Sequence, residues 1–143
     1  MSGKSLWVDV DRLEIREATI KPIPTTAKLV RVIAEGLDKA VPVKHIFPPG
    51  FETEARKFLR GCIEEEVGRS IIDISAARIA LQRAESRLEN LRRDGAPTDV
   101  ISRAASVVAY EGSQLERVLA YRKELADKHR QCTEEDEDDE RVS

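Results

Sequence analysis

The sequence predicts a mainly α protein, in which a long antiparallel helical hairpin, coiled-coil-like, follows a small mixed N-terminal segment with short strands. Three observations predict it. Apolar and small residues recur at alternating steps of four and three between Glu52 and Arg93, a turn-forming stretch with Gly95 and Pro97 follows, and a second apolar stripe continues after it. We therefore expect three parts, namely residues 1–50, residues 51–132 and residues 133–143.

The N-terminal segment begins with apolar residues at every second position. Leu6, Val8 and Val10 share this spacing, and Leu13 and Ile15 follow with the same spacing after a break. Alternation of this kind is typical of strands with one buried face. We expect one or two short strands here.

A short helix is the expectation for the next stretch. Thr25 or Thr26 can cap a helix whose apolar positions run from Leu29 to Leu37, although the β-branched residues within it leave a strand as the alternative. The whole segment can cap one end of the hairpin or lie as an arm on a neighbouring subunit. We favour the arm, because the segment has few large apolar residues with which to build its own core.

Two long helices form the hairpin. The first spans about Glu52 to Arg93, and at 1.5 Å per residue it is roughly 60 Å long. Gly95 suits a helix stop and Pro97 a first helical position, so the chain turns back and a second helix runs to about Gln131. The apolar residues that we assign to the interaction seam are Ile63, Val67, Ile74, Leu81, Leu88, Leu91, Ile101, Val108, Leu115, Val118 and Leu125.

Charge is distributed unevenly along the chain. The whole chain has a formal net charge of −3, whereas residues 1–133 alone carry +3. The difference comes from Arg141 and from an acidic tail made of Glu134, Glu135, Asp136, Glu137, Asp138, Asp139 and Glu140. Consecutive like charges repel, so we expect the tail to be disordered alone. It either neutralises a basic surface, on a partner or on this protein, or only keeps the chain in solution.

Composition and spacing indicate no catalytic chemistry. Charged residues make up 36% of the chain and aromatic residues 4%, which is unusual for an enzyme with a deep pocket. His129 and Cys132 are one helical turn apart and His45 lies in a connector, but these scattered ligands do not form a tetrahedral metal site. Cys62 and Cys132 are too few for a disulfide framework. We expect no catalytic residues, no cofactor and no metal.

No stretch of the sequence resembles a membrane anchor or a leader. A run of about 18 apolar residues and a signal-peptide pattern are both missing. We therefore expect no membrane association, and a location in the cytoplasm or within a soluble macromolecular assembly.

These features predict a non-enzymatic structural or assembly protein that oligomerises, or docks into a larger complex, through its hairpin and N-terminal arm. The partners are then proteins, either further copies of the chain or other subunits. The alternative is a nucleic-acid-associated regulatory protein whose acidic tail competes with phosphate for arginines on the first helix, such as Arg69, Arg78 and Arg83. Acidic residues are nearly as frequent on that helix, which favours ion pairs between helices instead.

Overall fold

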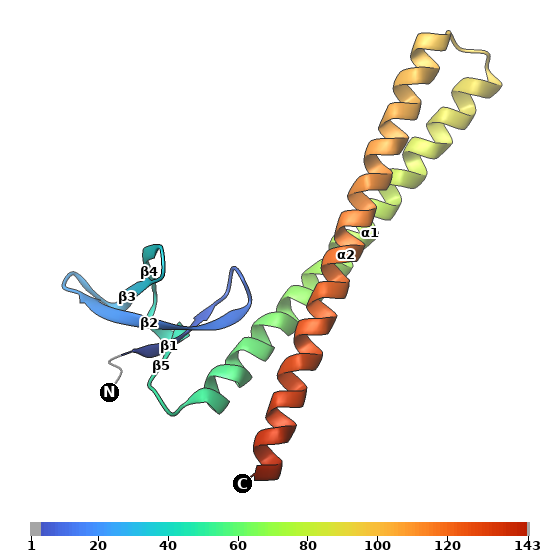
Figure 1. The fold of residues 1–143 in the computed structure, drawn as a ribbon. Helices are drawn as coiled ribbons and strands as arrows, with labels where there is room; N and C mark the ends of the chain where they lie inside the picture. The colour runs from blue at the N-terminus through green and yellow to red at the C-terminus, as the bar shows by residue number, and fades with distance from the viewer. Residues whose placement is uncertain (1–3, 143) are drawn as a thin grey trace. The chain divides into compact units, whose positions relative to one another are not determined.

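The computed structural model describes residues 4–142, with side chains described for residues 4–135. Figure 1 shows the elements in chain order: β1 (Ser5–Asp9), β2 (Glu14–Ile23), β3 (Thr26–Ala34), β4 (Leu37–Pro42), a 3₁₀ turn η1 (Val43–His45), β5 (Ile46–Phe47), α1 (Glu52–Arg93) and α2 (Thr98–Val142). The chain divides into two compact units. The first unit is residues 1–64 with residues 128–143, and the second unit is residues 65–127.

Residues 5–47 form an antiparallel five-stranded sheet with the strand order β4-β3-β2-β1-β5. The expected mainly α class is therefore wrong, because strands account for 24% of the chain and the fold is mixed α/β. Each strand pairs with its neighbour in sequence, except that β5 pairs with β1.

The expected short helix over residues 29–37 is also wrong, because this stretch forms β3 and the start of β4. The physical reason is that apolar and polar side chains alternate along this stretch. Val30 and Val32 pack with the core, while Arg31 between them donates from its Nε to Asp38 Oδ1 at 2.7 Å. β-Branched residues suit a pleated surface better than a helix. Gly36, with φ of 71°, supplies the left-handed conformation that the tight β3–β4 turn requires.

Trp7 is the centre of the sheet's apolar core. It packs with Ala18, Val32 and Val41 and is only 1% exposed. Two cations lie over its ring, with Arg16 Cζ 5.6 Å and Lys39 Nζ 5.4 Å from the ring centroid. Cations over an indole face add to the stability of such a core. The segment thus has the core of its own that the sequence did not indicate.

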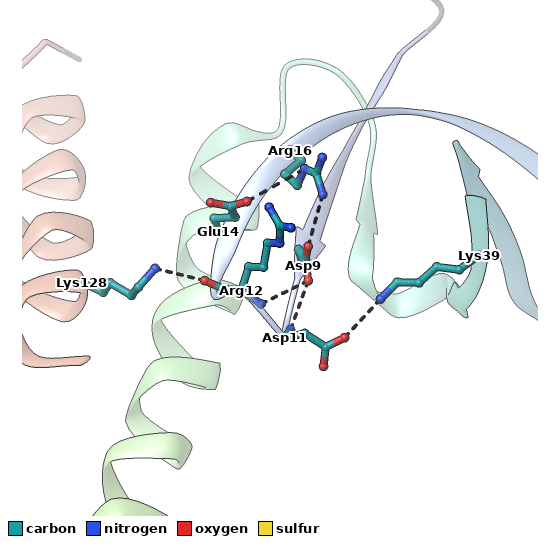
Figure 2. A network of polar contacts seen from close by, with 7 residues as sticks. All are labelled: Asp9, Asp11, Arg12, Glu14, Arg16, Lys39 and Lys128. Carbon is teal, nitrogen blue, oxygen red and sulfur yellow. Dashed lines mark hydrogen bonds and ion pairs between the residues drawn. The ribbon is translucent and has the colours of Figure 1, made fainter. Parts of the chain in front are cut away.

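A buried carboxylate organises the β1–β2 turn (Figure 2). Asp9 is 3% exposed, and its Oδ1 accepts the backbone N–H groups of Asp11 and Arg12 at 3.1 and 3.2 Å. Its Oδ2 pairs with Arg16 at 3.5 Å. Asp11 in turn pairs with Lys39 at 3.1 Å. These bonds hold a turn that includes Leu13, whose φ of 54° is unusual for a bulky residue.

The helix ends that belong to the first unit pack next to this sheet. The ring of Phe58 lies 5.3 Å from the His45 ring and 5.8 Å from the Phe47 ring. Lys128 of α2 donates to the Arg12 carbonyl at 3.0 Å (Figure 2), and His129 Nε2 lies 3.0 Å from Glu64 Oε1. Burial lowers the pKa of His45, with a smaller contribution from the charge of Lys44.

The corner between α1 and α2 is closed by backbone hydrogen bonds. Gly95 has φ of 69°, and the N–H of Ala96 reaches back to the Leu91 carbonyl at 3.0 Å. This is the pattern of a glycine helix stop, which satisfies carbonyls at the end of α1. Pro97 follows directly and its carbonyl accepts from Val100 at 3.1 Å, which starts α2.

The second helix continues beyond Gln131, where the apolar stripe ends, and its backbone stays helical through the acidic tail to Val142. Glu134 and Glu135 are exposed. The side chains of Asp136, Glu137, Asp138, Asp139 and Glu140 lie outside the described residues. In the described part of the chain, neither long helix has the apolar stretch that crossing a bilayer requires.

Candidate protein-interaction surfaces of the helical hairpin

The two long helices pack against each other, and the residues of the predicted seam are distributed over both of them. None of its eleven residues is exposed. Ile63, Ile74, Leu88 and Leu125 are buried, and the rest are half-buried. The seam is therefore covered within the chain, and a partner would have to contact other residues of the hairpin.

Large apolar side chains remain exposed outside the seam. Of the eleven exposed large apolar residues among those described, seven lie in residues 65–127. Ile72 is 70% exposed and Tyr110 is 61% exposed. The other five are Ile71, Ile79, Val107, Leu119 and Tyr121. Exposed apolar residues that cluster on one element mark interaction sites more often than scattered ones do.

One exposed stripe follows α1 on the side away from the seam. We define the Ile72 stripe as Gly68, Ile72, Ser75, Ile79, Gln82 and Ser86, all of them exposed and none charged. Their spacing alternates between four and three, so they follow one side of the helix for roughly 27 Å. A methyl group added at Gly68 would meet no atom within 4 Å. Among the described residues, none therefore fills the space beside that glycine.

A second surface combines both helices. A groove of about 340 Å³ is lined by Ala84, Arg87, Val100, Arg103, Ala104 and Val107, which places these parts of α1 and α2 on one side of the hairpin. Further along the same side, the Tyr121 hydroxyl donates a hydrogen bond to Glu66. We define the Tyr110 face as Asp73, Ala77, Ala80, Ala84 and Arg87 of α1 with Arg103, Val107, Tyr110, Gln114, Arg117 and Tyr121 of α2.

The Tyr110 face has an apolar centre and charged surroundings. Ala77, Ala80 and Ala84 are half-buried along its α1 row. At one end, Arg69 pairs with Glu66 at 2.9 Å, and burial together with the Glu66 carboxylate raises the pKa of Tyr121. Within the described residues, neither Asp73 nor Arg87 has an ion-pair partner. Their charges are therefore available to another molecule.

The polar network of the sheet is a weaker candidate for a binding site. Trp7 is almost completely buried and Asp9 has its acceptor positions occupied, so neither presents a free group. Among the described side chains, no three His, Cys, Asp or Glu residues are grouped so as to hold a metal ion. Cys62 is half-buried and Cys132 is buried. The polar network around Asp9 therefore serves to stabilise the β1–β2 turn.

Comparisons with models of protein families, with curated proteins and with solved structures found no significant match to the chain. The exposed surfaces of the hairpin are therefore interpreted from their own chemistry.

Sequence reasoning missed Ile72, Ile79 and Tyr110, because it followed only the strongest apolar stripe of each helix. The sequence did contain a signal for Ile72 and Ile79. The Ile72 stripe has the same alternating spacing as the seam and also lacks charge, and two such stripes on one helix indicate two contacts.

Proposed function

We propose that the protein is a non-enzymatic assembly protein, whose helical hairpin docks onto protein partners through the apolar surfaces that the chain itself leaves uncovered. The observation that carries this proposal is the exposure of seven large apolar side chains on residues 65–127 beside a seam that is covered. Burying one such side chain contributes about 1.5–3 kcal/mol. A partner that covers several of these side chains therefore binds with substantial affinity.

The proposal is tested by photo-crosslinking in the source cell. A photoreactive phenylalanine analogue is placed at Ile72, at Ile79 or at Tyr110, and matched controls carry it at the exposed charged residues Glu89 and Lys123. We expect discrete covalent adducts with proteins at the three apolar positions, and far less adduct at the controls. Equal adducts at all five positions, or none at any of them, would contradict docking through these surfaces.

A second candidate function is nucleic-acid binding regulated by the acidic tail. It is favoured by exposed arginines of the hairpin, including Arg78, Arg83 and Arg117, that have no ion-pair partner among the described residues. Against it, residues 65–127 hold ten basic and eleven acidic side chains, so this part of the hairpin has almost no net charge with which to attract phosphate.

Deleting residues 134–143 tests this candidate. If the tail competes with phosphate, the shortened chain binds duplex or single-stranded nucleic acid more tightly, most clearly at low salt where screening is weak. Fluorescence anisotropy with labelled oligonucleotides measures the change. Identical weak binding before and after deletion would remove this function from consideration.

A further inference from the structure

The Tyr110 face has the form of half of a four-helix bundle. Its α1 row, from Asp73 to Arg87, and its α2 row, from Arg103 to Tyr121, both advance in alternating steps of three and four. Two helices that each keep such a row on the same side form a layer onto which a second pair of helices can pack. The row of α1 contributes the small residues Ala77, Ala80 and Ala84, which allow close approach of another helix.

The two charged residues of the α1 row are placed symmetrically about Ala80. Asp73 lies seven residues before Ala80 and Arg87 lies seven residues after it, each two helical turns or about 10 Å away. Around an antiparallel two-fold axis at Ala80, Asp73 of one copy meets Arg87 of the other, and the pair occurs twice. A parallel arrangement would instead place like charges together, which is unfavourable.

The second helix has a compatible centre. The groove that puts Ala84 and Arg87 beside the segment from Val100 to Val107 places Ala80 at about the level of Val107 and Tyr110. The same axis therefore brings the exposed Tyr110 of each copy onto the exposed Val107 of the other. An aromatic ring against a β-branched residue is a favourable contact, and it covers two of the most exposed apolar side chains of the hairpin.

The area of the face fits a reversible dimer. From Arg103 to Tyr121 the face is roughly 30 Å long, and two adjacent helices are roughly 20 Å wide. Each copy would bury about 600 Å², or about 1,200 Å² in total, which is at the lower end of specific interfaces. We expect association in the micromolar range.

We infer that the Tyr110 face binds a second copy of this chain in antiparallel orientation, and that the two hairpins form a four-helix bundle around a two-fold axis at Ala80. This inference rests on the proposed assembly function, for which it names the partner of one surface. The Ile72 stripe lies on another side of α1 and remains free in such a dimer.

Charge reversal tests the inference in the full chain. Sedimentation velocity over a dilution series measures dimerisation of Asp73→Arg, of Arg87→Asp and of the double variant. We expect each single change to weaken dimerisation at least tenfold, and the double change to restore it to within about threefold of the original, because the pairs re-form with reversed sign. Arg83→Asp, on an exposed residue outside the face, is the matched control and should leave dimerisation unchanged.

Cysteine crosslinking tests the axis itself. An Ala80→Cys variant should form a disulfide between its two copies under mild oxidation, since a residue at a two-fold axis lies close to its own equivalent. Ile79→Cys, one residue away and on the Ile72 stripe, should not. Peptide mapping distinguishes these bonds from any that involve Cys62 or Cys132.

The outcomes separate this inference from the proposed function. A dimer that none of the charge reversals weakens would overturn the inference, because copies would then meet elsewhere. A monomer at every concentration that still forms adducts with other proteins from Ile72 or Tyr110 would overturn it too, and would leave the assembly function standing. A monomer that forms no such adducts would overturn both.

Discussion

The sheet and the hairpin of this protein differ in how far their apolar side chains are enclosed. In the first unit, Trp7 is enclosed by neighbouring side chains and two cations. Asp9 accepts hydrogen bonds from the backbone of Asp11 and Arg12 and pairs with Arg16. In the second unit, Ile72 and Tyr110 are mostly exposed, and Gly68 has open space beside it. The core around Trp7 is thus enclosed by its own chain, whereas residues 65–127 hold seven of the eleven exposed large apolar side chains among those described.

Geometry explains much of this contrast. A twisted sheet brings five strands around one tryptophan, so a short segment can bury a compact core. Two helices can bury only the stripe along which they touch, and every other apolar position stays in contact with water.

The largest effect is expected for the core of the sheet. Trp7→Ala removes the side chain around which Val32 and Val41 pack, and it should lower the free energy of unfolding by about 3–5 kcal/mol. Urea unfolding followed by circular dichroism measures this loss. Leu29→Ala, on an exposed residue of the same sheet, should change stability by less than about 0.5 kcal/mol and is the control.

A pair of isoleucines two residues apart compares the inside and the outside of α1. Ile74 is 3% exposed, so Ile74→Ala should lower stability by about 2–5 kcal/mol through lost contacts and the cavity left behind. Ile72→Ala should cost less than about 0.5 kcal/mol in the dilute protein. Thermal unfolding of both variants measures the difference, and equal losses would mean that the chain covers Ile72 after all.

Glycine replacement gives a smaller effect of the opposite sign. Because a methyl group at Gly68 meets nothing in the chain, Gly68→Ala should stabilise the dilute protein by about 1 kcal/mol through helix propensity. Gly95→Ala is the contrasting control, since φ of 69° disfavours any other residue and stability should fall. Denaturant midpoints of the two variants should therefore move in opposite directions.

The smallest effect concerns pH at the junction between sheet and helix. Because burial lowers the pKa of His45, the unfolded chain takes up this proton first as pH falls through about 6.5. The contribution of His45 to the free energy of unfolding is fully present above that pH. It decreases as the pH falls toward the lower pKa of the folded state. His45→Phe should reduce the loss of stability between pH 7.5 and 5.5, as measured by urea unfolding.

A matched variant separates the two histidines. His129→Gln removes the other imidazole of the chain and leaves His45 in place. If His129→Gln, and not His45→Phe, abolished the pH dependence, the explanation based on burial of His45 would be wrong.

The helices and their corner could be predicted from the sequence, because seam spacing, Gly95 and Pro97 are local signals that agree with one another. The sheet was only partly predictable. Leu29 to Ile33 contain apolar residues that suit both a helix and a strand, and the choice is made by pairing with the neighbouring strands β2 and β4. Likewise, Lys39 lies over the Trp7 ring, and no local pattern connects these two residues.

The exposed surfaces were missed for a related reason. Periodicity identifies which side of a helix is apolar, but it does not reveal how much of that side a neighbouring helix covers. Only the structure shows that Ile74 is enclosed while Ile72 is not. Residues of this kind are found by asking which apolar positions remain after the strongest stripe has been used.

The strand order β4-β3-β2-β1-β5 has a consequence for growth into fibrils. The two borders of the sheet are β4, which contains Asp38, Lys39 and Pro42, and β5, which has only two residues. Charged residues, a proline that lacks a donor and a very short border strand all discourage pairing with a foreign chain. Concentrating the protein should therefore not recruit further copies by strand addition, and the sheet can tolerate crowding that would polymerise one with long, uncharged borders.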